Sequence, residues 1–238
     1  MPEFTALWEG GPAFAQAEHF KLSTDCVLLA DFVNSSGRKR GIDLGCASGA
    51  IALLLLWRSP RLHMTGLELV EEAAELAREN METNSLQDRS SIIWGDIRRH
   101  RGLFKSGSFD LVVANPPYFP VDRGKLSTDE KRSGARGELS CTLEDICAAA
   151  SYLCCTGGSF SVVYKPERLS ELLCTMTAHG LEPKRLRLVC HRADSAPSLV
   201  LVEGRRGGRP GLDILPSLIL TGPDGRETEE VLRIYHRI

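Results

Sequence analysis

The stretch Arg40-Gly41-Ile42-Asp43-Leu44-Gly45-Cys46-Ala47-Ser48-Gly49 decides the fold, because a short apolar strand runs directly into a glycine-rich turn. The apolar run 50–57 follows at once and is typical of a helix. Glycines permit positive φ and let the backbone approach a ligand closely. The first N–H groups of the following helix point at whatever binds in the turn. The segment therefore predicts a strand, turn and helix that bind a nucleotide-type cofactor.

Two carboxylates indicate the kind of cofactor. Glu68 ends the apolar stretch 62–67, about 20 to 25 residues after the turn, where such units place the carboxylate that binds a ribose. Asp43 lies at the mouth of the turn, where its charge repels a pyrophosphate and attracts a cation. S-adenosylmethionine carries an ammonium and a sulfonium, so the pair favours this cofactor over a dinucleotide.

A third carboxylate, Asp96, follows the apolar run 91–94 through Gly95. It can accept a hydrogen bond from the adenine amine of that cofactor, or it can cap the next segment as a helix N-cap. Both interpretations stay open at this stage.

A second motif, Asn115-Pro116-Pro117-Tyr118, follows the apolar run Phe109 to Ala114. The Asn115 side-chain oxygen and the Pro116 carbonyl are hydrogen-bond acceptors, and consecutive prolines fix the direction of that carbonyl. Tyr118 can stack on a planar base. An exocyclic amine conjugated to a ring is a poor nucleophile, so acceptors that hold its protons must turn its lone pair toward a methyl donor. Alone the motif is typical of a proline-rich turn, but beside a cofactor site it predicts methyl transfer to such an amine.

These motifs, in this order and spacing, resemble the class I S-adenosylmethionine-dependent methyltransferases that methylate amino groups. Two flanking segments, Phe20-Lys21-Leu22-Ser23-Thr24-Asp25 and Cys141-Thr142-Leu143-Glu144-Asp145, are similar to those of the bacterial tRNA (valine) adenine-N6 methyltransferases. The resemblance covers roughly residues 15 to 210. It implies S-adenosylmethionine as the cofactor, tRNA as the partner, and the anticodon-loop adenine next to the anticodon as the methylated base.

The resemblance also assigns roles to residues. Catalytic roles fall on Asn115, Pro116 and Tyr118, and cofactor binding falls on Asp25, Asp43, Gly45, Gly49, Glu68, Asp96 and Asn115. Ala47 departs from the usual glycine, and its methyl group is expected to crowd the cofactor and weaken its binding. Asp25 has a second explanation, which is favoured here: a carboxylate in the first turn of a helix is stabilised by the macrodipole.

Binding of RNA must come from local charge, because the net charge is −2 and the pI about 6.3. The stretch between Pro120 and Ser140, about 20 residues, is longer than an ordinary connection. Its candidate substrate-binding residues, with Pro117 before it, are Arg123, Lys125, Lys131, Arg132 and Arg136. A second basic group comprises Lys184, Arg185, Arg187, Arg192, Arg205, Arg206 and Arg209. Acids are interleaved in the loop, so a solvated polar loop explains its composition as well.

Strand-length apolar runs alternate with helical periodicity, which predicts an α/β fold of the Rossmann-like class I methyltransferase kind with a seven-stranded, mostly parallel sheet. The expected strands are 40–44, 62–67, 91–94, 109–114, 158–164, 185–190 and 198–203. The expected helices are 24–34, 49–58, 70–83, 142–153 and 167–179. Residues 193–197 are too few for a crossover helix, so the last two strands are expected to form an antiparallel hairpin.

The chain is expected to form one domain over 1–211, with an N-terminal helical lead-in at 1–38. A short extension at 212–238, of no assigned role, ends in a helix near 227–236. The 8 cysteines form no C-x-x-C pair and have no zinc-like histidine spacing, so we expect no metal and reduced thiols in a cytoplasmic protein. No targeting or membrane-spanning segment and no obligate protein partner are expected.

Three alternatives share parts of this pattern. A protein glutamine-N5 methyltransferase needs the same acceptor pair, but its family carries a sizeable N-terminal helical domain, and fewer than 40 residues precede the first strand here. A DNA or rRNA adenine-N6 methyltransferase is the second, and a DNA enzyme usually adds a recognition domain for which the chain has no room. The third is a non-catalytic S-adenosylmethionine-binding or RNA-binding module, which the intact motif 115–118 disfavours.

Overall fold

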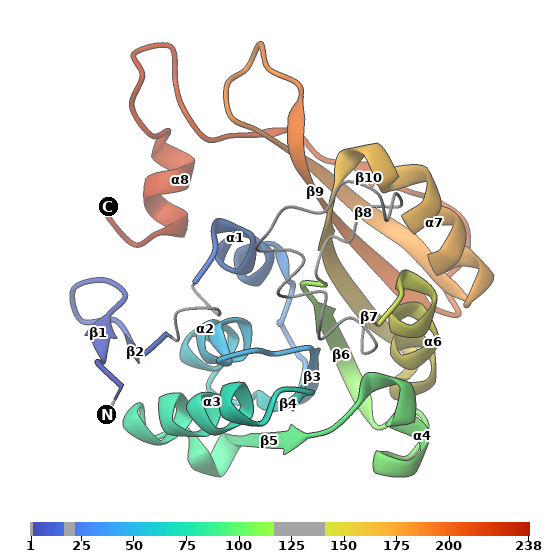
Figure 1. Ribbon diagram of the computed structural model, residues 1–238. Coiled ribbons are helices and arrows are strands. Elements are labelled where there is room, and N and C mark those ends of the chain that lie inside the picture. The colour runs from blue at the N-terminus through green and yellow to red at the C-terminus, as the bar shows by residue number, and fades with distance from the viewer. Residues whose placement is uncertain (1, 17–21, 117–140) are drawn as a thin grey trace, which may run out of the picture.

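The computed structural model describes residues 2–16, 22–116 and 141–238. Its long strands are β3 (Arg40–Leu44), β4 (His63–Glu68), β5 (Ser90–Trp94), β6 (Phe109–Ala114), β7 (Cys154–Tyr164), β8 (Leu181–Cys190) and β9 (Pro197–Arg206). Two-residue strands β10 (Asp213–Ile214) and β11 (Leu218–Ile219) add to the same sheet. The order is β10-β8-β9-β7-β6-β3-β4-β5, with β11 also paired to β8 (Figure 1).

The predicted fold class is confirmed. Strands β3 to β7 pair in parallel, whereas β9 runs antiparallel to both β7 and β8. All seven expected strands are present, and β8 and β9 form the expected hairpin. The two short strands were not predicted from the sequence, because two residues are too few to show a period of two.

Helices cover both faces of the sheet (Figure 1). One face packs against α1 (Thr24–Phe32), α2 (Ala50–Arg58) and α3 (Glu71–Thr83). The other packs against α6 (Leu143–Leu153) and α7 (Leu169–Ala178), with the short α4 (His100–Leu103) beside α6. Because successive strand residues point to opposite faces, β6 places Leu111 and Val113 in the first core and Val112 and Ala114 in the second.

Local capping explains where two of these helices begin. The Thr142 side chain accepts from the Asp145 N–H while the Asp145 carboxylate accepts from the Thr142 N–H, a capping box that starts α6. Ser23 caps α1 by accepting from the Cys26 N–H. Short 3-10 turns, which the sequence analysis did not predict, are η1 (Gln87–Arg89), η2 (Ile97–Arg99) and η4 (Pro166–Arg168).

Both ends of the chain lie on the same side of the molecule, at the left in Figure 1. A small hairpin of β1 (Thr5–Ala6) and β2 (Ala13–Phe14) lies N-terminal to α1, and α8 (Glu229–Ile234) lies close to the C-terminus. The Trp8 ring stacks on His236 with centroids 4.0 Å apart. The proposed division at 211 stays a prediction. In the ranges 2–16, 22–116 and 141–238, no helix has the length and apolar character needed to cross a membrane.

Candidate active site

The motifs meet at the carboxyl edge of the sheet, because the strands that precede them are parallel. The chain runs from β3 outward through β4 to β5 and then returns to β6 on the other side of β3. This reversal between β3 and β6 is the place where open α/β sheets bind ligands. Asp43 near the end of β3 and Asn115 after β6 therefore flank it.

The glycine turn after β3 depends on left-handed backbone. Gly45 has φ 78° and Gly49 has φ 85°. A Cβ on Gly49 would also lie 3.1 Å from Met81 Cε and 3.2 Å from Ala77 Cβ, so this glycine lets α2 approach α3. Ala47 adopts φ 47° as well, a conformation that costs a residue with a side chain roughly 1–2 kcal/mol. The departure from glycine at this position thus places strain in the turn itself.

Glu68 holds the turn in place. Its Oε2 accepts a hydrogen bond from the Ala47 N–H at 2.8 Å, and its Oε1 accepts from the Val70 N–H at 2.8 Å. The side chain is 7% exposed. Each carboxylate oxygen keeps a second lone pair, so binding of a ribose hydroxyl remains compatible with this structural role. The assignment of Glu68 to the ribose stays a prediction.

Asp43 is a fully buried carboxyl near the end of β3. It is 0% exposed, and neither oxygen has a hydrogen-bond partner among the described residues. Burial, with a smaller contribution from the negative charge of Glu68, raises the pKa of Asp43 to about 8. A buried carboxyl that makes no hydrogen bond with the described residues, beside a turn that allows close approach, fits a ligand that brings a positive charge.

Asn80 on α3 is a residue that the sequence analysis missed. It is 0% exposed, and its Nδ2 donates to the Ser48 carbonyl and to the Ala15 carbonyl, both at 2.9 Å. Its Oδ1 accepts from the Ala15 N–H at 2.7 Å. Asn80 therefore joins the glycine turn to the N-terminal segment. The available signal was a polar residue directly before Met81 on the apolar stripe of the helix.

Asn115 and Pro116 follow β6 directly, and Pro116 is buried while Asn115 is half-buried. The Asn115 Nδ2 donates to the Cys26 Sγ at 3.2 Å, and Ser23 Oγ donates to the same sulfur at 3.4 Å. An amide that uses its N–H₂ group toward α1 directs its oxygen elsewhere. Cys26, to which the sequence analysis assigned no role, thus contacts the predicted catalytic amide.

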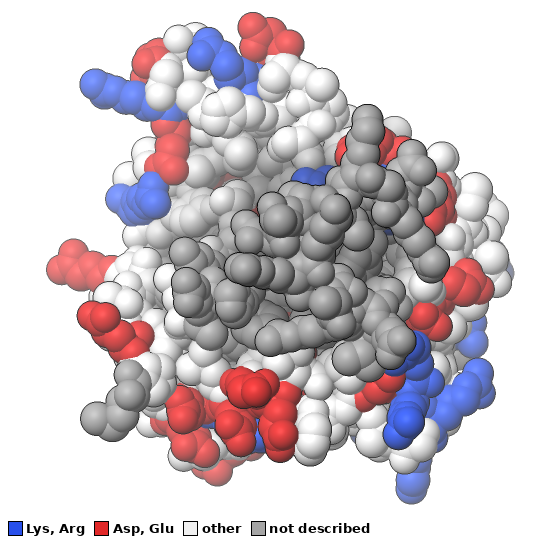
Figure 2. Space-filling model, viewed as in Figure 1, with Lys and Arg blue, Asp and Glu red and all other residues white. Residues whose placement is uncertain are grey.

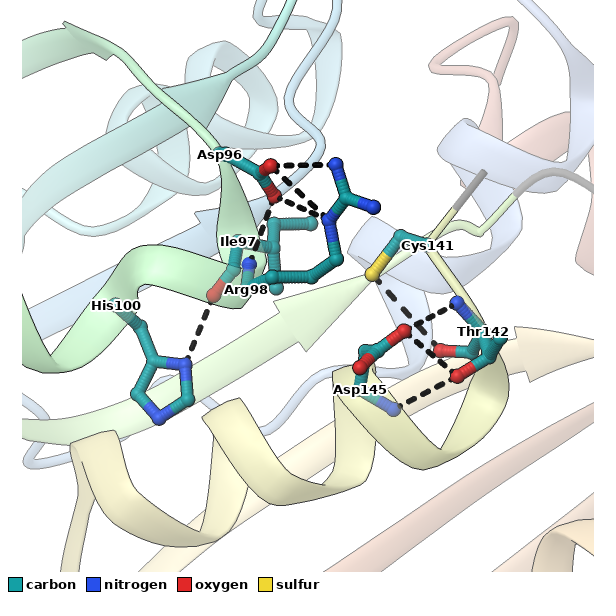
Figure 3. A network of polar contacts seen from close by, with 7 residues as sticks. All are labelled: Asp96, Ile97, Arg98, His100, Cys141, Thr142 and Asp145. Carbon is teal, nitrogen blue, oxygen red and sulfur yellow. Dashed lines mark hydrogen bonds and ion pairs between the residues drawn. The ribbon is translucent and has the colours of Figure 1, made fainter. Parts of the chain in front are cut away.

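Asp96 caps η2 and pairs with an arginine (Figure 3). Its Oδ1 accepts from the Arg98 N–H at 2.9 Å, and its Oδ2 lies 2.6 Å from Arg98 Nη2. Hydrogen bonding to Arg98 is the main cause that lowers the pKa of Asp96. The capping role is therefore present in the structure, and contact with an adenine amine stays a prediction. Asp25 lies in the first turn of α1, as the favoured explanation requires, and its cofactor role stays untested.

The other predicted site residues lie outside the described ranges. They are Pro117, Tyr118, Arg123, Lys125, Lys131, Arg132 and Arg136. Their roles stay predictions.

The thiols around the site are protonated. Burial is the main cause that raises the pKa of Cys26, and it raises the pKa of Cys46 well above its usual value with help from Asp43 and Glu68. Burial, followed by the charge of Asp145, raises the pKa of Cys141 to about 12. The thiolate is the nucleophilic form of cysteine. These residues therefore give no support to a covalent cysteine mechanism.

Comparison with known proteins agrees with this geometry. The pattern of the methyltransferase small domain family matches residues 17–173. The chain belongs to this family. The methyltransferase is also 31% identical, over 79% of its own length and 77% of the relative, to the tRNA1(Val) (adenine(37)-N6)-methyltransferase of Aeromonas hydrophila subsp. hydrophila.

Solved structures show the same fold. A "predicted O-methyltransferase" from Agrobacterium tumefaciens has a TM-score of 0.73 at 22% identity, over 90% of this chain and 96% of that one. Geranyl diphosphate C-methyltransferase from Streptomyces coelicolor A3(2), solved with S-adenosyl-L-homocysteine, has a TM-score of 0.54 at 15% identity, over 75% and 80% of the chains. The methyltransferase is an S-adenosylmethionine-dependent enzyme. Asp43, which has no hydrogen-bond partner among the described residues, lies beside the glycine turn and fits that cationic cofactor.

Proposed function

We propose that the methyltransferase transfers a methyl group from S-adenosylmethionine to the N6 amine of an adenine in tRNA, in the anticodon loop beside the anticodon. The observation that carries this proposal is the position of Asn115 and Pro116 at the end of β6, across the switch point from the buried Asp43. The Aeromonas relative, whose name specifies adenine 37 of a valine tRNA, supports the same substrate. Since the substrate is tRNA, we propose that the enzyme acts in the cytoplasm.

Orientation of the amine is the main task of the protein in this reaction. The cofactor supplies a methyl group already activated by a sulfonium. Asn115 Oδ1 and the Pro116 carbonyl accept the two amine protons, so that the nitrogen lone pair faces the methyl group. Well-held reactants gain about 7–11 kcal/mol in such a step. The target base must leave its stack to reach these acceptors, which is least costly in a single-stranded loop.

The contact with Cys26 supports a structural role for the Asn115 Nδ2 group and an accepting role for its Oδ1. Because Nδ2 donates to Cys26 Sγ at 3.2 Å, the amide cannot turn its donor group toward the target amine without losing that bond. A donor facing an amine proton would repel the substrate. The described geometry therefore favours an accepting function for Asn115.

The variant Asn115→Ala tests the proposal. We expect a fall in methyl incorporation of about 100- to 1,000-fold, the range for loss of one preorganised hydrogen-bonding group. Binding of S-adenosylmethionine, measured by calorimetry, should change little. Asn34→Ala, an exposed position after α1, is the matched control and should retain full activity. Equal methylation of tRNA by Asn115→Ala and by the wild type would contradict the role of Asn115.

The substrate is tested separately by mass spectrometry of nucleosides. tRNA from a strain without the enzyme should lack one N6-methyladenosine, and the purified enzyme should restore it. DNA, ribosomal RNA and a glutamine-containing peptide assayed in parallel test the alternatives. Incorporation into one of these, and none into tRNA, would overturn the proposed substrate.

A further inference from the structure

A basic surface lies beside the candidate site, on the segment that follows β5. Between Ile97 and Ser108 the chain carries Arg98, Arg99, Arg101 and Lys105 and no carboxylate. All four side chains are exposed. Figure 2 shows lysine and arginine atoms gathered at the lower right, where Figure 1 places α4. We call these four residues the α4 basic surface.

Most of the charge on this surface is not neutralised by residues within 2–16, 22–116 or 141–238. Arg98 pairs with Asp96. Among the described residues, no carboxylate lies within ion-pair distance of Arg99, Arg101 or Lys105. The Arg101 guanidinium lies 4.6 Å above the Tyr152 ring, and a stacked guanidinium keeps its N–H groups at its edge for a further partner.

The basic residues on β8 and directly after it differ, because protein groups already bind their charges. Arg185 pairs with Glu203, Arg187 with Glu230, and Arg192 lies 3.8 Å from Asp194. The Lys184 ammonium donates to the Arg209 carbonyl. These four cations are engaged within the protein, so they are weaker candidates for phosphate contacts than the α4 basic surface.

The α4 basic surface is also directly connected to the site. Asp96, at the end of β5, caps η2, and Arg98 lies beside Cys141 and Thr142 at the start of α6 (Figure 3). On the other side of the same sheet edge, α3 exposes the acids Glu71, Glu72, Glu75, Glu79 and Glu82. Acidic atoms gather over α3 in Figure 2, below and to the left of its centre. A polyanion is therefore repelled on the α3 side and attracted on the α4 side.

We propose that the α4 basic surface binds backbone phosphates of the substrate RNA next to the target adenine. This inference rests on the proposed function and adds the side from which the RNA approaches: over α4, away from α3. The partner is a polyanion. Each phosphate that a Lys or Arg neutralises releases condensed counterions, so binding of such a partner must weaken as the salt concentration rises.

The test is the salt dependence of tRNA binding in the double variant R99E/K105E. Arg99 and Lys105 are chosen because neither side chain makes a hydrogen bond, an ion pair or a ring contact with the described residues, whereas Arg98 and Arg101 do. The matched control is R61E/K39E, which makes the same change in charge at exposed positions before the amino ends of β3 and β4. Binding is followed by fluorescence anisotropy of labelled tRNA over a series of KCl concentrations.

We expect R99E/K105E to bind tRNA at least tenfold more weakly than the wild type at low salt. In a plot of the logarithm of the binding constant against the logarithm of the salt concentration, its slope should be shallower by roughly 1.4 to 1.8, which is roughly 0.7 to 0.9 for each lost phosphate contact. The control should keep the wild-type slope. Melting temperature and S-adenosylmethionine affinity should match the wild type, and K105E alone, with about half the change in slope, serves if the double variant is unstable.

Each contrary outcome separates the two proposals. Wild-type methylation of tRNA with an unchanged slope in R99E/K105E overturns the α4 basic surface and leaves the proposed function standing. An equal loss in R61E/K39E also overturns it, because net charge and not position would then govern binding. Both proposals are overturned if the wild-type enzyme neither binds nor methylates tRNA and R99E/K105E loses binding to an acidic protein instead.

Discussion

Replacement of Asp43 by asparagine should change how the stability of the cofactor-free enzyme depends on pH. The folded protein keeps the Asp43 proton up to a pKa of about 8, whereas the unfolded chain loses it near the ordinary value of 3.8. Between these values the unfolded state binds fewer protons, so the free energy of unfolding falls as the pH rises. The stabilising effect of the proton is complete below pH 3.8 and is lost as the pH passes about 8.

The magnitude follows from the width of that window. At about 1.36 kcal/mol per pH unit, the wild type should lose about 4 kcal/mol of unfolding free energy between pH 5 and pH 8 through this one group. D43N has nearly the same shape and no proton to lose, so it should lack this part of the pH dependence. The difference matters because the total free energy of unfolding of a typical domain is only about 5–15 kcal/mol.

Urea unfolding of cofactor-free protein at pH 5, 6, 7 and 8 measures the effect. The gap between D43N and wild type should widen steadily in favour of D43N as the pH rises. Asp88→Asn, an exposed position in η1, is the matched control and should follow the wild type. Wild-type and D43N curves that stay parallel within about 1 kcal/mol, the scale of one ordinary hydrogen bond, would refute the reasoning.

Cofactor binding gives a second measurement on the same residue. A cationic ligand beside Asp43 favours the ionised carboxylate, so the wild type should release close to one proton on binding S-adenosylmethionine at pH 7. Calorimetry in two buffers of different ionisation enthalpy counts that proton. D43N should release none from this position and bind more weakly. An equal proton count in both proteins would show that Asp43 does not meet the positive charge of the cofactor.

Three further predictions concern the residues around the turn and the acceptor pair. Asn80→Ala leaves several buried backbone groups without their hydrogen-bond partner, so it should lower the free energy of unfolding by about 3 kcal/mol or more. The melting temperature and the cofactor affinity should fall together. Asn84→Ala, at a residue that does not contact the glycine turn, should leave the cofactor affinity unchanged. Ala47→Gly should remove the strain of a left-handed backbone conformation, an effect that the greater entropy of glycine in the unfolded chain partly offsets. We expect the free energy of unfolding to rise by about 0.5 kcal/mol and cofactor binding to become tighter. Cys26→Ala should lower kcat about fivefold, the equivalent of about 1 kcal/mol from a lost hydrogen bond to Asn115, without changing cofactor affinity. Cys26→Ser should restore part of the loss, and a variant whose only defect is in melting temperature would contradict the positioning role.

The sheet was predictable because its strands are long enough to show their pattern. The run Phe109–Ala114 predicted β6 residue for residue, and the short connection after Cys190 predicted the hairpin of β8 and β9. The predictions of strands β7 to β9 were short by several residues at one or both ends, because polar and glycine residues there continue the pairing without the apolar signal. Hydrogen bonding and not composition defines those ends.

The site was predictable only where its chemistry shows in local sequence. Asp43, Glu68 and Asn115 stand at or next to strand ends, and their residue types at those positions, together with the family resemblance, made them candidates. The contacts of Asn80 with Ala15 and of Asn115 with Cys26 join residues 65 and 89 positions apart, and no periodicity within one segment reports such pairs. The sequence therefore indicated which groups are present and left their partners to the tertiary structure.

Those partners decide which acid can be tested alone. Glu68 and Asp96 both accept hydrogen bonds from backbone N–H groups, so a neutral variant of either would release a turn or a helix start as well as any ligand. A loss of cofactor affinity in such a variant would have two causes that binding data cannot separate. Asp43 accepts none from the described residues, so an asparagine there removes only the group that would ionise when the cofactor binds and breaks no hydrogen bond with those residues. Of the three acids at this sheet edge, Asp43 is therefore the one whose variant reports on the positive charge of the cofactor directly.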